Sequence, residues 1–310
     1  MNESLQTSAC LVGERYLLAS TALSEYIDYV EEMLPEDARG KGVSQHVDDW
    51  HRCMDVMKAL RQSEAGIADA PVVKELPQAM RPLQAELQSS SGFMRGYGDL
   101  PTRIALVDLH QLVVYQPHVV MDHVNRLCSR IAKLKGPAAL FRFCQGSDQE
   151  LAPLSFEKYG EEMVVFRSPS KDLRYLEPLI LQQGQTTGYM PTGKVGAILG
   201  LAVGFGSNLL NAIEYEGRLL LNNGYHRATA LANAGMRFIP CVIQSVRHPD
   251  EFGLAGTRLA EASRAFYFSD PRPPMLKDFI DPRLYRDINV VHRERRIVIR
   301  YQVSTVDVAI

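Results

Sequence analysis

The stretch Asn222-Asn223-Gly224-Tyr225-His226-Arg227 decides how this chain is interpreted. A strand-like apolar run precedes it and an alanine- and leucine-rich run follows, so a strand-to-helix turn is expected. The first amides of a helix lack intrahelical partners and the helix dipole adds positive charge there, so anions settle at such turns. The glycine permits close backbone approach, the arginine offers a bidentate fork, and the histidine can donate a hydrogen bond or move a proton. The asparagines can cap the helix or orient a ligand. The six residues therefore predict a phosphate site, and an ordinary turn with a solvated His-Arg pair is the alternative interpretation.

The segments around this turn indicate a mixed arrangement of strands and helices. The dipeptide Glu216-Gly217 predicts a hairpin between strands at 211–215 and 218–221. A helix is expected to follow the turn and to end at Gly235, before a strand at 238–243. Upstream, strands are expected at 104–107, 112–115, 138–144 and 162–167, and helices at 14–34, 43–63, 117–135 and 173–182. The alternation in 296–308 predicts a final strand.

Proline and serine clusters between residues 66 and 101 place a soft domain boundary near residue 100. We therefore expect a mostly helical, acidic region over 1–100 and an α+β or α/β domain over 101–248. The domain is expected to carry an insertion around 137–205, and a C-terminal extension over 249–310 is expected to end in a strand.

Composition narrows the class of protein. The chain has 310 residues, 46% hydrophobic and 23% charged, which is an ordinary globular mixture. The net charge is −2 and no segment is strongly basic, so a dedicated nucleic-acid binder is not expected. The five cysteines form no CxxC pair, which favours reduced thiols over zinc or disulfides. The N-terminal residues do not resemble a secretory signal, and no apolar run is long enough to span a bilayer, so a cytoplasmic protein without membrane association is expected.

Residues 211–246 resemble the core of the ParB/sulfiredoxin-like superfamily. The resemblance rests on Gly224-Tyr225-His226-Arg227, on the alanine- and leucine-rich helix with its terminal Gly235, and on Ile239-Pro240 in the next strand. A weaker resemblance lies at 103–127, where Val107-Asp108-Leu109-His110 and Gln116-Pro117 are similar to the opening strand and turn of ParB-type domains. The resemblance implies a compact α/β fold with a small mixed sheet that binds nucleotide phosphates at the turn. It also implies phosphate contacts from Gly224, His226 and Arg227.

Two departures narrow the activities that this superfamily offers. Sulfiredoxins place a reactive cysteine immediately before His-Arg, and this chain has Tyr225 there, so sulfur chemistry is not expected. ParB clamps follow the nucleotide domain with a helix-turn-helix, and the proline-rich sequence after residue 246 shows no pair of short helices. A fold of this kind does not by itself choose an activity.

Other residues complete the candidate site. Gly188–Lys194 fits GxxxxGK, but Val195 replaces the Mg²⁺-binding hydroxyl, so Lys194 is retained only as a phosphate contact from a loop. Asp108 and Glu214 are the carboxylates selected as a base or a Mg²⁺ ligand, each with a structural role as the alternative. The pairs His46/His51 and His118/His123 are five residues apart and point in different directions on a helix, so no metal site is predicted.

Three functions follow, in order of preference. The first is a nucleotide-phosphate-binding protein that uses ATP or CTP with Mg²⁺, as a small-molecule kinase or an NTP hydrolase. In it, the phosphate site is Asn222 to Arg227 with Lys194, and the catalytic candidates are His226, Asp108 and Glu214. The second is a non-catalytic regulatory or assembly protein, whose protein partner binds residues 1–100 or the C-terminal strand. The third is a nucleotide-gated DNA-binding protein.

Overall fold

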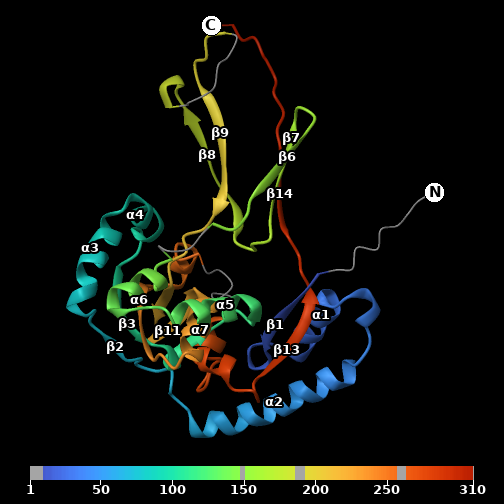
Figure 1. Cartoon of the computed structure of the whole chain (residues 1–310), viewed down its shortest axis with the longest axis vertical. Coiled ribbons are helices and arrows are strands. Elements are labelled where there is room, and N and C mark those ends of the chain that lie inside the picture. The colour runs from blue at the N-terminus through green and yellow to red at the C-terminus, as the bar shows by residue number, and fades with distance from the viewer. Residues whose placement is uncertain (1–9, 147–150, 186–192, 257–262, 310) are drawn as a thin grey trace. The chain divides into compact units, whose positions relative to one another are not determined.

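The computed structural model describes residues 10–146, 151–185, 193–256 and 263–309. The chain divides into two compact units (Figure 1). Unit 1 consists of Met1–Gln149 and Asn208–His292, and unit 2 of Glu150–Ser207 and Arg293–Ile310. Unit 1 thus combines the part of the chain that precedes residues 150–207 with most of the part that follows them. In the described residues, no helix is both long and apolar enough to cross a bilayer.

A six-stranded sheet forms the centre of unit 1, in the order β2-β3-β12-β10-β11-β4. Strands β10 and β12 are parallel, as are β11 and β4, and the other neighbours are antiparallel. The expected mixed α and β class is therefore confirmed. The strands are β2 (Val73–Lys74), β3 (Thr102–Asp108), β4 (Leu112–Val114), β10 (Asn211–Tyr215), β11 (Arg218–Asn223) and β12 (Phe238–Ser245).

The elements around the quoted turn are confirmed. Glu216 and Gly217 both have positive φ, 47° and 77°, which is the geometry of a tight hairpin turn between β10 and β11. Helix α7 (Tyr225–Asn233) follows, and Gly235 has a φ of 75° beyond its end. Strand β12 then begins at Phe238. The turn preferences of the sequence and the main-chain hydrogen bonds of the structure therefore specify the same elements over this whole segment.

A second sheet of unit 1 corrects the expected helix over 14–34. Strand β1 (Leu11–Leu17) lies between β13 (Tyr285–Val291) and β5 (His118–Val120), and the α-helix is limited to α1 (Leu23–Met33). All seven β1 residues have partners in β13. Hydrogen bonding to a strand some 270 residues away therefore overrides the local helical spacing.

The remaining helices of unit 1 pack against one another and around its two sheets. Segment 138–144, expected to be a strand, is helix, because Gly136 and Pro137 start it and Phe141 and Cys144 bury one side. The α-helices are α2 (Val43–Ser63), α3 (Arg81–Ser89), α4 (Ser91–Tyr97), α5 (Met121–Ile131), α6 (Gly136–Cys144) and α9 (Arg264–Phe268). Short 3₁₀ turns are η1 (Leu18–Ser20), η2 (Glu36–Ala38), η3 (Gln78–Met80), η4 (Leu109–Gln111), η6 (Pro249–Gly253) and η7 (Leu276–Ile280).

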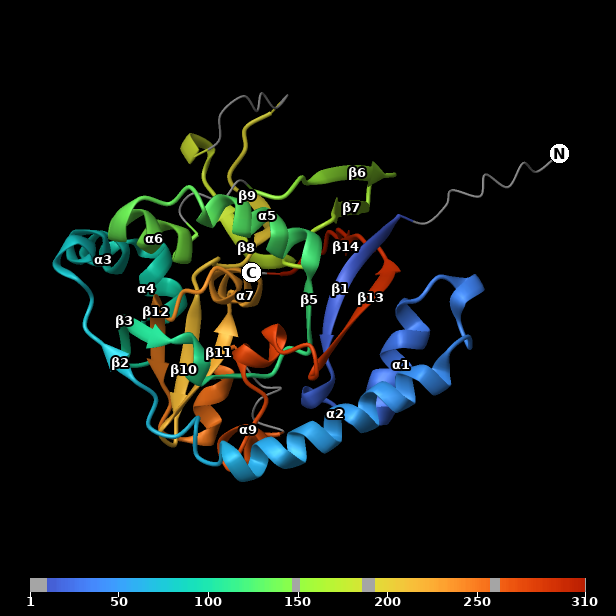
Figure 2. The same ribbon diagram turned by 60° about the horizontal axis from the view of Figure 1, so that its bottom comes forward.

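Both faces of the sheet are covered, which holds the end of β11 in place. Helix α5 packs against α7 and α6 against β12 (Figure 2). The other face is covered by Phe252, Phe268 and Met275 from the C-terminal third of the chain. The first four residues of β11 are consequently all buried, as expected for a strand enclosed on both sides.

Unit 2 consists of two small sheets. The first has the order β14-β7-β6, and the second pairs β8 with β9. The helix expected over 173–182 is wrong, since β8 pairs with β9 from Leu173 to Leu181, with one register shift between Tyr175 and Glu177. The final strand expected over 296–308 ends at Arg300. The strands are β6 (Ser155–Tyr159), β7 (Met163–Ser168), β8 (Leu173–Leu181), β9 (Ile198–Phe205) and β14 (Arg295–Arg300), and the turn η5 (Gln183–Gln185) follows β8.

Candidate functional site

Gly224 makes the turn from β11 into α7. Its φ of 94° is in the region that favours glycine, and a Cβ built there would lie 2.9 Å from Cγ of Leu210. The first hydrogen bond inside the helix joins the Ala228 amide to the Gly224 oxygen over 2.8 Å. The amides of residues 225–227 therefore form the first turn, where the helix dipole is positive.

The two asparagines order this turn. Tyr115 donates its hydroxyl hydrogen bond to Oδ1 of Asn222 over 3.1 Å, and Nδ2 of Asn222 donates to the oxygen of Ala255 over 3.0 Å. Oδ1 of Asn223 accepts from the amide of Gly224 over 2.8 Å. Asn222 thus connects the end of β11 to Tyr115 and to Ala255. Asn223 stabilises the backbone of the turn itself.

Tyr225 points into the core. Its hydroxyl donates to the oxygen of Leu221 over 2.5 Å and accepts from the amides of Tyr115 and Gln116, at 3.2 and 3.4 Å. Burial raises the pKa of Tyr225 well above its ordinary value. The side chain therefore holds the chain that leaves β4 against the end of β11.

His226 uses one ring nitrogen inside the protein. Its Nε2 lies 3.0 Å from the amide of Val120 and accepts that hydrogen bond, so the neutral ring carries its proton on Nδ1. The ring packs edge-on against His123, with centroids 5.1 Å apart. Burial, followed by the charges of Arg126 and Arg227, lowers the pKa of His123. The Nε2 lone pair of His226 is thus already occupied by a main-chain donor.

Arg227 is buried, with 2% of its surface exposed. One terminal nitrogen donates to the main-chain oxygens of Cys144 and Phe143, at 2.5 and 3.3 Å, and the other to Oδ1 of Asn208 at 2.8 Å. Burial lowers the pKa of Arg227 to about 10. The guanidinium binds carbonyls at the C-terminal end of α6, where a cation offsets the helix dipole.

The two predicted carboxylates lie elsewhere in the sheet. Asp108 is buried, and its oxygens accept from the amide of His110 and from Nε of Arg237, at 3.0 and 2.8 Å. Two strands separate β3 from β11, a distance of roughly 14 Å. Glu214 pairs with Leu219 beside the hairpin turn, at the opposite end of β11 from Gly224. Both oxygens of Glu214 accept from Arg103 at 2.7 Å. The structure does not bring either carboxylate to the turn.

Lys194 is exposed and belongs to unit 2, and residues 186–192 of its GxxxxGK motif lie outside the described residues. Within the described ranges, no group of three or more His, Cys, Asp or Glu side chains is placed to hold a metal ion.

The sequence interpretation missed several residues that build the site. Asn208 and the carbonyls of Phe143 and Cys144 hold Arg227, and the Val120 amide holds His226. Main-chain groups give no sequence signal of this kind. Tyr115 directly precedes Gln116-Pro117, which formed part of the weaker resemblance, and β4 does pair with β11. That adjacency was the one available indication that Tyr115 lies beside the turn.

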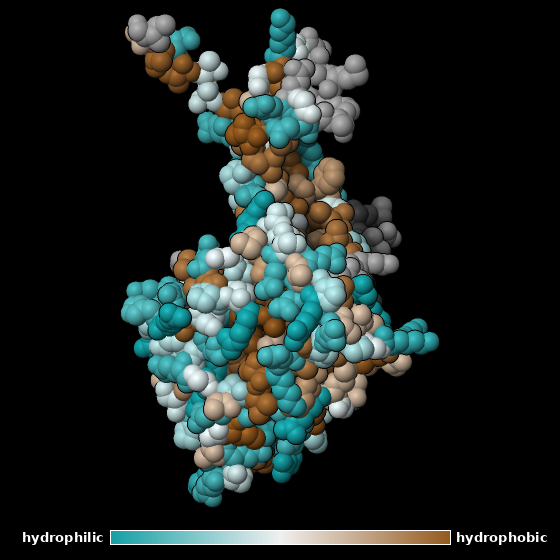
Figure 3. Space-filling model, turned by 90° about the vertical axis from the view of Figure 1, so that its left-hand side faces the viewer, coloured by the Kyte–Doolittle hydropathy of each residue, from teal (hydrophilic) through white to brown (hydrophobic). Residues whose placement is uncertain are grey.

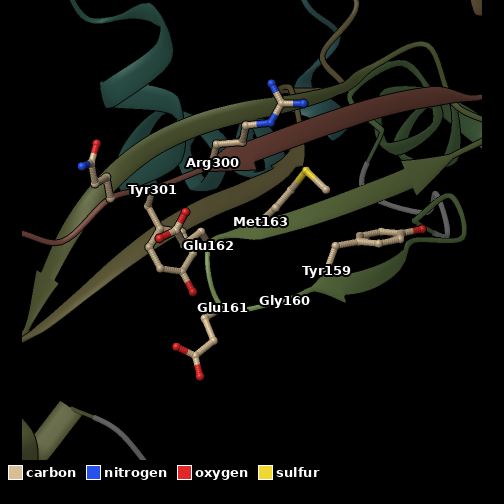
Figure 4. Close-up of a pocket in the computed structure, with 8 residues that line it drawn as sticks. Tyr159, Gly160, Glu161, Glu162, Met163, Arg300 and Tyr301 are labelled. Atoms are coloured by element: carbon tan, nitrogen blue, oxygen red, sulfur yellow. The ribbon is translucent and has the colours of Figure 1, made fainter.

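A shallow pocket of about 760 Å³ lies in unit 2, at the β6–β7 turn and the end of β14 (Figure 4). The amide of Tyr301 donates to the oxygen of Glu162 over 3.0 Å, and the two side chains lie beside each other in the figure. None of the residues predicted from the sequence lines this pocket. Its lining residues are Tyr159, Gly160, Glu161, Glu162, Met163, Arg300, Tyr301 and Gln302.

Comparison with known proteins gives no assignment: no family model matches the chain, and neither a curated protein nor a solved structure matches it.

Proposed function

We propose that this protein acts without catalysis, as a regulatory or assembly protein that binds a partner through unit 2. The observation that carries the proposal is the distribution of exposed apolar side chains. Most of the large exposed ones among the described residues belong to unit 2, although unit 1 is much the larger. They are Leu151, Leu154, Phe156, Tyr159, Tyr175, Leu176, Ile180, Leu199, Val298, Tyr301, Val303, Val306 and Val308.

Seven of these side chains lie on the strands of the two small sheets, namely Phe156, Tyr159, Tyr175, Leu176, Ile180, Leu199 and Val298. Phe156 is 69% exposed on β6, and Ile180 and Leu199 are each 66% exposed as cross-strand partners in β8 and β9. Figure 3 shows apolar surface exposed on the strands of unit 2 in that view. Contiguous apolar surface of this kind is costly in water and typically marks an interaction site.

The state of the predicted catalytic residues supports a role without chemistry. Arg227 is committed to internal carbonyls, Nε2 of His226 accepts from a main-chain amide, and Asp108 and Glu214 are ion-paired away from the turn. A phosphotransfer site needs a base or a Mg²⁺ ligand beside the phosphate. Asp108 and Glu214, the two carboxylates predicted for these roles, both lie away from the turn.

The test compares the wild-type protein with a Leu199→Lys/Ile180→Lys variant of unit 2 and a His226→Gln variant of the turn. Product release from ATP and CTP with Mg²⁺ is measured for each, and each is purified with its partners from the native cell. We expect no turnover from any protein, and a defined partner or assembly that the unit 2 variant loses and the turn variant keeps. Turnover by the wild type that His226→Gln abolishes would overturn the proposal.

A second candidate function is nucleotide-phosphate binding at the turn, with ATP or CTP and Mg²⁺, in a small-molecule kinase or NTP hydrolase. The specific observation in its favour is positive charge beside the first turn of α7, where Arg126, Arg227 and Arg130 all contribute to the lowered pKa of His123 after burial. Together with the helix dipole, these charges favour an anion.

Isothermal titration with ATP, CTP and ADP, with and without Mg²⁺, tests this candidate. Arg126→Gln is the informative variant, because Arg126 is exposed and its replacement leaves the core intact. A loss of about tenfold in affinity would place the phosphate near α5, since tenfold corresponds to about 1.4 kcal/mol for a lost charge contact. Absence of binding by the wild-type protein to all three nucleotides would eliminate the candidate.

A further inference from the structure

The β8–β9 hairpin of unit 2 is a sheet of two strands, nine and eight residues long. Among the described residues, β9 has a strand partner on one side only. Two-stranded sheets are marginal in water, and further strands or a packed face are needed for stability. Strand β14 packs against β8 but belongs to another sheet, and the outer edge of β9 offers main-chain hydrogen-bonding groups to a further strand.

The two strands of the hairpin differ in the features that prevent edge pairing. Strand β8 contains the charged residues Arg174 and Glu177 and the proline Pro178, and its register with β9 shifts between Tyr175 and Glu177. Charges, proline and irregular register are what proteins use to block an edge strand. Strand β9 has the sequence ILGLAVGF, with no charge and no proline.

The pattern of β9 matches itself. From residue 199 to 205, the large residues Leu199, Leu201, Val203 and Phe205 occupy one face and the small residues Gly200, Ala202 and Gly204 the other, and Ile198 at the start of the strand lies on the face of the small residues. In a two-fold antiparallel pair, residues that face each other must point to the same side of the sheet. Large residues therefore meet large ones and small residues meet small ones.

We propose that β9 pairs antiparallel with β9 of a second copy of this chain, with Ala202 on the two-fold axis. Leu199 then faces Phe205 of the other copy, Leu201 faces Val203, and Gly200 faces Gly204. The product is a continuous four-stranded sheet, β8-β9-β9-β8, in an isologous dimer. The inference rests on the proposed function and names its partner. A second copy is the occupant because the uncharged edge presents no like charges to itself and its alternation stays in register over seven residues, from Leu199 to Phe205.

Sedimentation of the full chain over a range of concentrations tests the dimer. Leu199→Lys is the disrupting variant and Ile180→Lys is its matched control, because the two residues are cross-strand partners and both are 66% exposed. We expect the wild type to dimerise, Leu199→Lys to weaken the dimer at least tenfold, and Ile180→Lys to weaken it much less. If the wild type remains monomeric up to about 100 μM, its affinity for a second copy is too weak for a specific dimer, and the inference is overturned. Equal weakening by both variants also overturns it.

Disulfide trapping gives a second readout that does not depend on the stability of a lysine variant. In a Cys10→Ser background, which removes the exposed cysteine, Ala202→Cys is expected to cross-link two chains, because directly facing Cα atoms in antiparallel strands suit a disulfide. Ile180→Cys is expected to remain uncross-linked. Efficient cross-linking through Ile180 and none through Ala202 overturns the proposed pairing. If the protein is monomeric but its unit 2 captures a different protein, the assembly function stands and the second copy is excluded.

Discussion

The guanidinium of Arg227 donates to the main-chain oxygen of Cys144 over 2.5 Å, and this bond joins the beginning of α7 to the end of α6. The residue that the sequence offers as the phosphate fork is thus used, in the described structure, to stabilise a helix end. The neighbouring residue His226 is half-buried, so its side chain is more exposed to solvent than that of Arg227.

Arg227→Ala is expected to lower the free energy of unfolding by about 3 kcal/mol, because it leaves buried carbonyls without a donor and opens a cavity. Urea unfolding followed by circular dichroism measures the loss. His226→Gln is the control, since the glutamine oxygen can accept from the Val120 amide and should change stability by less than about 1 kcal/mol. A small loss in Arg227→Ala would return the arginine to consideration as a ligand contact.

Arg272 and Asp278 form a buried ion pair, with both side chains 1% exposed and with bonds of 2.8 and 2.6 Å. Asp278→Ala should lower the free energy of unfolding by about 3–5 kcal/mol, because it leaves a buried charge with only part of its partners. The Arg272→Met/Asp278→Leu double variant should lose less than either single variant. Additive losses in the same unfolding experiment would contradict this coupling.

Gly224→Ala and Gly235→Ala separate a steric clash from backbone strain. Both glycines have positive φ, but only the Cβ at 224 meets neighbouring atoms, with Leu210 Cγ at 2.9 Å, and nothing lies within 4 Å at 235. Gly235→Ala should cost about 1–2 kcal/mol from strain alone, and Gly224→Ala clearly more. Thermal unfolding of the two variants side by side decides the matter, and equal losses would remove the clash with Leu210 from the explanation.

Glu214 makes stability depend on pH in the acid range. Hydrogen bonds from Arg103, which outweigh the effect of burial, and then from Ser245 lower the pKa of Glu214 below its ordinary 4.5. A carboxylate with a lowered pKa stabilises the fold above about pH 4.5, and this contribution disappears as the pH falls through its folded value.

Glu214→Gln should therefore be less stable than the wild type at pH 7 and should lose stability less steeply below pH 4.5. Urea midpoints measured from pH 7 down to about pH 3 give the comparison. Parallel curves for the two proteins would show that the Arg103–Glu214 ion pair contributes nothing to the loss of stability in acid.

The accuracy of the sequence interpretation follows the range of the interactions involved. Glu216-Gly217, Gly235 and the alternating apolar strands act over a few residues, and the hairpin, α7 and β12 were predicted from them. Leu11–Leu17 and Leu173–Leu181 have no comparable local signal, and their strand pairing depends on β13 and β9. The strand predicted for 138–144 was wrong, because a short apolar run suits a buried strand or a helix equally.

The sequence by itself determined that a hairpin leads through a glycine-containing turn into a helix, because turn preferences and hydrophobic periodicity are local properties of the chain. It also predicted which side chains would contact a phosphate, and that prediction stays untested. Only the tertiary structure decided where those side chains are used. Arg227 faces the end of α6, and Asp108 and Glu214 face their own ion-pair partners. The physical reason is that a charged or polar group takes the partners that folding brings within hydrogen-bond distance, and distant segments supply those partners.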